Sequence, residues 1–211
     1  MMKWRFLPIV GIVVSVALLV LAALNYPGGN EWNTAETGFR ITKNYVSALF
    51  QPNAINGATN SARLFAVPAM LLLCTSLAFM FWDISKHGQS QVVRKSIEIG
   101  GIGSMVYTLL GVLTRMHDLL VVIAAIFFGV AAIGMIYSLH KAKRLWSALI
   151  GLVCFGLLLA LGAMRHANVF PNLAPITEWA LFALTAVWVL FTYTASAPNN
   201  SFKPTPLRGA A

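Results

Sequence analysis

Six long apolar stretches constrain the fold of this chain more than any other feature of its sequence. Each is close to the length of about 20 helical residues that crosses the hydrocarbon core of a bilayer. Stretches of that length, separated by polar segments, predict membrane-spanning helices. The expected helices lie near residues 6–24, 64–83, 97–114, 119–139, 146–164 and 177–195.

The scarcity of charge argues against an ordinary soluble globule. The chain has 211 residues, of which 58% are hydrophobic and 10% are charged, and its mean hydropathy is +0.75. A soluble domain has about 45–50% apolar and about 25% charged residues. Because so few charges cannot cover a globule of this size, lipid must solvate it. The sequence therefore predicts an all-α fold, a six-transmembrane-helix bundle over residues 1–195.

The basic residues indicate how the helices are oriented. The net charge is +9, but lysines and arginines occur in short clusters beside apolar runs, which is typical of cytoplasmic flanks and not of nucleic-acid-binding surfaces. With the N-terminus inside, ten of them fall on the inner side and five on the outer side. This bias predicts that both termini are cytoplasmic. We expect a multi-pass protein of a prokaryotic inner membrane, with its first apolar run retained as a helix.

The longest polar segment, residues 25–63, is expected on the outer side. Turn signals stand at Pro27-Gly28-Gly29 and at Asn56-Gly57. Between them apolar residues recur at helical spacing, which predicts a short interfacial helix near 41–51 on the outer membrane surface. The final segment, 196–211, is polar and rich in proline, so we expect a disordered cytoplasmic tail.

The expected helix centres contain no ionisable side chain other than buried cysteine and tyrosine. Their remaining polar groups are hydroxyls, such as those of Ser104, Thr108 and Thr185. Proton-coupled pumps and ion channels usually carry charged relays or filter motifs at this depth, so both classes are disfavoured. Cys74 and Cys154 lie within apolar runs and outside any CxxC pair, which predicts buried small residues and no redox site.

Small residues mark the faces on which helices are expected to pack. Ser96, Gly100, Ser104 and Thr108 stand four apart in the third apolar run. This spacing lines one face of a helix and lets two backbones approach closely, which is a main source of helix association in lipid.

Charged side chains gather at the two expected membrane boundaries. At the inner boundary, Asp83 and Glu98 lie among basic residues, which predicts surface ion pairs. At the outer boundary, the arginines suit an anionic headgroup or carboxylate because guanidinium binds such groups bidentately. Each outer residue also has an ordinary interpretation, since Asp118 and Glu178 suit helix N-termini and arginines can snorkel. The candidate ligand-binding residues are Arg63, Arg115, His117, Asp118, Arg165 and His166.

Three functions are compatible with this pattern. The first is binding of a membrane lipid headgroup or small amphiphile at the outer leaflet, without a cofactor. The second is an intramembrane lipid hydrolase that uses His117, Asp118 and His166 as acid–base groups or zinc ligands, although adjacent helical residues point about 100° apart and make a poor ligand pair. The third is a non-catalytic partner of another membrane protein.

Several short motifs resemble one family of membrane proteins. They are Tyr-Pro-Gly-Gly at 26–29, Gly-Phe at 38–39, Lys-Asn-Tyr-Val-Ser at 43–47, Asn-Gly at 56–57 and Met-His-Asp at 116–118. Together they resemble the bacterial and archaeal multi-pass proteins grouped as domain of unknown function 998, over residues 1–195. The resemblance implies an architecture and no settled activity. Where that family commonly has Ser-Asp-Leu-Gly, this chain has Ser47-Ala48-Leu49-Phe50, so no role of the acidic residue carries over.

A looser likeness is to intramembrane hydrolases of the alkaline-ceramidase and adiponectin-receptor type. Those enzymes combine serine, aspartate and histidines, and they carry a His-x-x-x-His pair late in the chain. This sequence has no such pair, which weakens the zinc-hydrolase interpretation.

Overall fold

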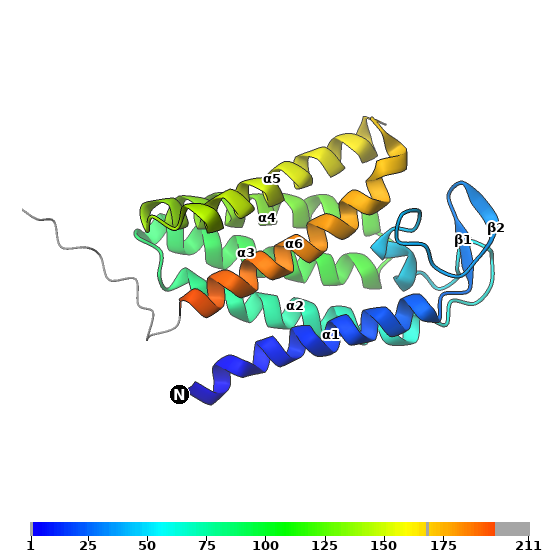
Figure 1. Ribbon diagram of the computed structural model, residues 1–211, viewed down its shortest axis with the longest axis horizontal. Helices are drawn as coiled ribbons and strands as arrows, with labels where there is room; N and C mark the ends of the chain where they lie inside the picture. Colours follow the sequence, from blue (N-terminus) through cyan, green and yellow to red (C-terminus); the bar gives the residue numbers. More distant parts are fainter. Residues whose placement is uncertain (1, 168, 197–211) are drawn as a thin grey trace, which may run out of the picture.

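The predicted bundle of six long helices is confirmed. The computed structural model describes residues 2–167 and 169–196, and the six α-helices in this part of the chain run side by side (Figure 1). Short 3-10 helices precede or join some of them: η1 (Met2–Phe6), η2 (Val46–Phe50) and η3 (Pro171–Leu173). The α-helices are α1 (Leu7–Leu24), α2 (Arg63–Ser85), α3 (Gln91–Leu113), α4 (His117–Lys141), α5 (Leu145–His166) and α6 (Ala174–Ala195).

Some helices begin earlier than their apolar runs. The third was expected near 97, but α3 starts at Gln91 because the Ser90 side chain accepts the N–H of Val93 and caps a polar first turn. The sixth was expected near 177, but α6 starts at Ala174 with Pro175 in its first turn, a position that proline favours. Hydropathy thus located the apolar part of each helix and not its polar turns.

Five of the helices close into a ring. Each of α2, α3, α4, α5 and α6 packs against the next, and α6 packs back against α2. The first helix lies outside this ring against α2. The described ends of the chain lie together at the end of the bundle opposite the β-strands (Figure 1), as an even number of spans requires.

The ring is filled with large side chains in the half nearest the chain ends. Trp188 is fully buried and donates its indole N–H to the Ser147 carbonyl at 2.8 Å. Phe81, Met135 and Ile97 from three other helices are also buried there. This half of the bundle therefore has a packed core.

The outside of the bundle is apolar, as lipid solvation demands. Ile126, Ile133, Leu159 and Val187 are each more than half exposed. In the described part of the chain, six helices are long and apolar enough to cross a membrane. These properties identify an integral, multi-pass membrane protein.

A cap formed by residues 25–62 covers the other end of the ring. It contains an antiparallel hairpin of β1 (Gly28–Asn30) and β2 (Asn33–Thr37), followed by η2. A short helix was expected near 41–51, on the membrane surface. The helix observed is only the five-residue η2, and its Val46, Leu49 and Phe50 are buried against the bundle, because the end of the ring offers these apolar side chains a closer fit than the lipid surface.

Ion pairs gather at the end of the bundle opposite the cap. Arg5 lies 3.1 Å from Asp83 and donates to the Tyr193 carbonyl at 2.8 Å, which ties the N-terminus to α2 and α6. Lys95 pairs with Glu98 at 2.8 Å. The ion pairs expected for Asp83 and Glu98 are therefore confirmed. The tail expected over 196–211 lies outside the described residues from 197 onward.

Candidate functional site

A cavity of about 360 Å³ opens inside the ring in the half next to the cap. All five ring helices and the cap segment 45–50 contribute to its wall. Its volume lies within the usual 300–1,000 Å³ of small-molecule sites. The hollow half of the bundle therefore faces the cap, and the packed half faces the chain ends.

The cavity reaches deep between the helices and is apolar over most of its depth. On α3 its wall runs from Val112 down to Ser104, eight residues that span about 12 Å at 1.5 Å per residue. Thr185 and Cys74 line the same depth from α6 and α2. The side chains between the mouth and this floor are mostly aliphatic or aromatic, among them Met70, Leu73, Met105, Phe128, Leu181 and Phe182.

Acidic, basic and histidine side chains stand only around the mouth of this cavity among the described lining residues. Four of the six candidates expected from the sequence are present there: His117, Asp118, Arg165 and His166. The other two, Arg63 and Arg115, are outside the lining. Arg63 begins α2 half-buried, and Arg115 is exposed in the turn between α3 and α4. The shared depth of the six candidates therefore correctly predicted that those on α4 and α5 lie near one another. It did not predict that Arg63 and Arg115 lie outside the cavity.

His117 is held by the preceding helix. Its Nδ1 lies 3.0 Å from the Gly111 carbonyl oxygen. Because a carbonyl can only accept, Nδ1 carries the proton in this bond, and in the neutral ring Nε2 is then the acceptor. The bond orients the imidazole at the cavity mouth and closes the turn between α3 and α4.

Arg165 contacts both the neighbouring helix and the cap. Its guanidinium lies 3.7 Å from Asp118 and 4.7 Å from the centre of the Tyr45 ring. The Asp118 side chain is 85% exposed, so water screens this pair and its stabilising effect is small. Burial raises the pKa of the Tyr45 phenol, partly offset by Arg165, so Tyr45 stays neutral. In the part of the chain that the structure describes, the carboxylate that pairs with this guanidinium is thus the exposed one of Asp118.

Glu178 is a site residue whose role was not expected. The sequence predicts it in the first turn of a helix, where the helix dipole favours a negative charge, but α6 begins at Ala174 and Glu178 lies beyond its first turn. In the structure, its carboxylate accepts the backbone N–H of Val46 at 2.6 Å and lines the cavity. The neighbouring Trp179 donates to the Asn44 carbonyl at 3.0 Å. An acidic residue followed by tryptophan at the outer end of a span was the only sequence signal, and it does not reveal partners 130 residues away.

The cap is built to hold segment 44–50 over the cavity. The buried side-chain amide of Asn60 donates to the carbonyls of Ala48, Leu49 and Gln51 at 3.0, 3.3 and 2.9 Å. Phe39 stacks edge-on against Trp179, with ring centres 5.8 Å apart. These contacts make the cap a fixed roof.

The two basic residues of the cap are occupied elsewhere. Arg40 and Lys43 both pair with Glu36, the latter at 3.5 Å. Asn30 also donates to this carboxylate, at 2.6 Å. Arg40 and Lys43 therefore hold the cap together and do not face the cavity.

No group of three or more histidine, cysteine, aspartate or glutamate side chains in the described residues has an arrangement that could hold a metal ion. His117, Asp118 and His166 share the cavity mouth but do not form such a group. The geometry therefore gives no support to the alternative of a zinc site at these residues.

Comparison with family models, curated proteins and solved structures found no match for this chain. The resemblance to domain of unknown function 998 stays a prediction.

Proposed function

We propose that the protein binds an amphiphile of the outer leaflet, with an apolar chain in the cavity and a polar headgroup at its mouth. The observation that carries this proposal is the division of the cavity into an apolar shaft and an ionisable rim. An amphiphile has the same division. A fully polar ligand would leave the aliphatic wall against water, and a fully apolar one would leave the rim unused.

Burial of the chain adds little to the preference for one membrane amphiphile over another. Each methylene moved out of water contributes about 0.8 kcal/mol, but a chain that is already in the bilayer gains little by this route. The contribution from the headgroup therefore decides which amphiphile is held. This reasoning favours a ligand whose headgroup matches the rim.

The rim favours an anionic headgroup. Arg165 presents a guanidinium whose ion-pair partner among the described residues is the exposed Asp118, and the imidazoles of His117 and His166 line the same mouth. Guanidinium binds phosphate and carboxylate oxygens with charge-assisted, often bidentate hydrogen bonds. Glu178 lines the same cavity with its carboxylate bonded to the Val46 N–H, and in the described part of the chain it forms no ion pair with Arg165.

Arg165→Ala tests the proposal, with Arg115→Ala as its matched control. Both arginines lie at the same end of the bundle, but only Arg165 lines the cavity. Detergent-solubilised protein is titrated with phosphatidylglycerol and, separately, phosphatidylcholine of the same chain length, and bound lipid is measured by native mass spectrometry. A charge-assisted hydrogen bond contributes about 1.5–3 kcal/mol, so Arg165→Ala should weaken phosphatidylglycerol binding by about tenfold to a hundredfold.

Arg115→Ala should leave phosphatidylglycerol binding unchanged, and phosphatidylcholine should bind more weakly than phosphatidylglycerol to the unaltered protein. Equal loss in both arginine variants, or equal binding of the two lipids, would contradict an anion site at Arg165.

The hydrolase and the assembly partner stay predictions. A hydrolase built on His117, Asp118 and His166 as zinc ligands would contain stoichiometric zinc that is lost in His117→Ala. Elemental analysis of the purified protein would detect it. An assembly partner would tolerate alanine at His117, Asp118 and Arg165 without loss of its phenotype.

A further inference from the structure

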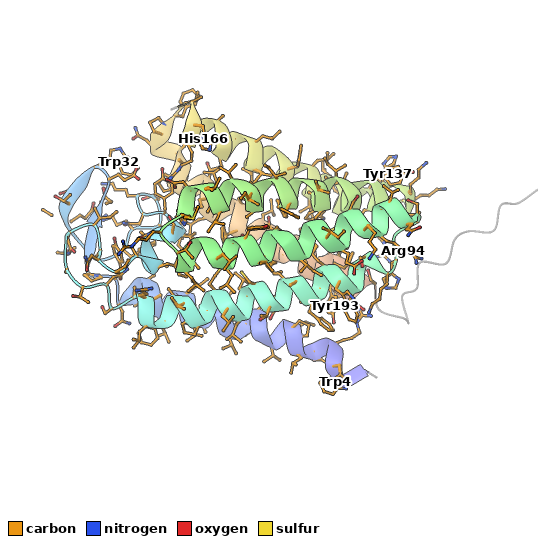
Figure 2. All side chains as sticks on the ribbon, turned by 180° about the vertical axis from the view of Figure 1, so that it is seen from behind. Trp4, Trp32, Arg94, Tyr137, His166 and Tyr193 are labelled. Atoms are coloured by element: carbon orange, nitrogen blue, oxygen red, sulfur yellow. The ribbon has the colours of Figure 1, made fainter. Side chains whose placement is uncertain are left out.

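The wall of the cavity is thin between α4 and α5. Val122 of α4 lines the cavity and is 36% exposed. On α5, Gly162 lines the same stretch, and a Cβ added there would meet no atom of another helix within 4 Å. Figure 2 shows α5, which ends at the labelled His166, leaning away from the neighbouring helices toward the cap end.

Two contacts mark the ends of this thin stretch. Near the cap, Arg165 of α5 reaches Asp118 of α4 at 3.7 Å. Deeper in the bundle, the Phe155 ring packs against Gly129. A Cβ added to this glycine would lie 3.6 Å from the ring. Ten residues separate Phe155 from Arg165, which is about 15 Å along a helix. The opening between the two contacts is therefore about half of the roughly 30 Å hydrocarbon thickness.

The facing residues follow one antiparallel register. Asp118, Val122, Ala125 and Gly129 are spaced by four, three and four, so they share one face of α4. Phe155, Leu158, Gly162 and Arg165 share one face of α5 in the same way. The contacts at both ends pair Asp118 with Arg165 and Gly129 with Phe155, so Val122 stands opposite Gly162 and Ala125 opposite Leu158. We call the space bounded by these eight residues the window.

Two other sides of the cavity are closed by direct contacts: the seam between α3 and α4, and the roof. Along α3, Gly103 packs against Phe127, and a Cβ at Gly111 would lie 3.5 Å from Val121. The roof is held to α6 by Glu178 and Trp179. A ligand that enters between α4 and α5 from the bilayer would pass small or aliphatic side chains, among them Val122, Ala125 and Gly162.

We propose that the window admits one chain of an outer-leaflet phospholipid sideways into the cavity, while its headgroup stays beside Arg165. This inference rests on the proposed function and adds the class of ligand and its route. A single chain is the occupant because about 360 Å³ lies near the lower limit of ligand sites. Arg165 lies at the end of the window nearest the cap. A lipid whose chain passes through the window therefore brings its headgroup to Arg165.

Cross-linking of the window tests this route. The double variant Val122→Cys with Gly162→Cys is joined by a short bis-maleimide. A matched control, Ile133→Cys with Leu152→Cys, ties the same helices where Ile136 and Gly151 already pack. Single-cysteine variants control for the buried native thiols Cys74 and Cys154. Native mass spectrometry follows the exchange of bound phosphatidylglycerol for its deuterated form in mixed micelles.

We expect the uncross-linked double variant to bind phosphatidylglycerol and exchange it. Cross-linking before loading should prevent binding, and cross-linking after loading should slow exchange by about tenfold or more, since the barrier acts on both association and dissociation. The control pair should exchange at an unchanged rate.

The two proposals fail differently. If phosphatidylglycerol does not bind the unaltered protein, the proposed function fails. If it binds, and the cross-linked window exchanges lipid as fast as the control, the lateral route is overturned while the proposed function stands.

Discussion

Glu178 illustrates how single residues join the cap to the bundle. Its carboxylate accepts from Val46 in the cap, 132 positions away in the chain. A carboxylate that accepts a backbone N–H satisfies a donor at a helix start, which here is the start of η2. The position of a charged residue along the chain could be read from the sequence, but this partner could not, because it depends on how six helices fold back on one another.

The same distinction applies to the candidate site. His117, Asp118, Arg165 and His166 were predicted from their common depth, and all four line the cavity mouth. Depth says nothing about the angle of a residue around the bundle axis. Arg63 and Arg115 share that depth and are outside the lining, and Tyr45 and Ser47 line the cavity although the sequence placed their segment on a membrane surface.

Glu36 supports a prediction about the cap. Burial raises the pKa of its carboxyl, but hydrogen bonding from Asn30 and the charges of Arg40 and Lys43 lower it more, so the pKa lies below the ordinary 4.5. A depressed carboxyl pKa stabilises the folded cap above pH 4.5, and this stabilisation is lost as the pH falls below it. Glu36→Gln removes the charge at neutral pH.

Glu36→Gln should therefore speed hydrogen exchange at pH 7 in the backbone amides of 28–44, measured by mass spectrometry. The control is Glu31→Gln, an exposed glutamate in the turn of the same hairpin. If both variants exchange alike, the account of the cap as held together by Glu36 is wrong.

At the scale of elements, the pair α3 and α4 has the closest packing. The small-residue face predicted in the third apolar run is the face of α3 that packs against α4. A Cβ added at Gly100 would lie 2.7 Å from the backbone nitrogen of Ala131 and 2.7 Å from the carbonyl oxygen of Phe127. Backbone atoms cannot move aside as a flexible side chain can. The sequence revealed the face but not its partner helix.

Gly100→Ala should destabilise the bundle, with Gly156→Ala as the control. Overpacking costs about 1–3 kcal/mol, whereas nothing lies within 4 Å of a Cβ at Gly156, and alanine is favoured over glycine in a helix by up to about 1 kcal/mol. Thermal unfolding in detergent should show a lower midpoint for Gly100→Ala and an equal or higher one for Gly156→Ala. A lowered midpoint for Gly156→Ala alone would contradict the packing described.

The whole molecule is divided along its length into a packed half and a hollow half. The number of spans and their approximate bounds were predictable because apolar length is a local property of the sequence. The cavity was not predictable, because its volume is what remains after side chains from five helices have packed. Hydroxyls such as Ser104 and Thr185 were noted at this depth, but only the fold places both at the floor of one cavity.

Orientation in the membrane is a prediction of the whole chain. The basic-residue bias places the cap outside, so Trp32→Cys should react with a membrane-impermeant maleimide in spheroplasts. Lys141→Cys, exposed at the opposite end of the bundle, should react only after permeabilisation. The reverse pattern would place the cavity mouth on the cytoplasmic side and contradict an outer-leaflet ligand.

The most direct test of the central claim is photo-cross-linking with phosphatidylglycerol that carries a diazirine at the end of one chain. The protein is reconstituted with this lipid in phosphatidylcholine vesicles, irradiated, and mapped by mass spectrometry of its peptides. We predict labelling of residues deep in the cavity, such as Cys74, Ser104 and Thr108. Labelling confined to residues on the outside of the bundle, such as Ile133 and Leu152, would contradict it.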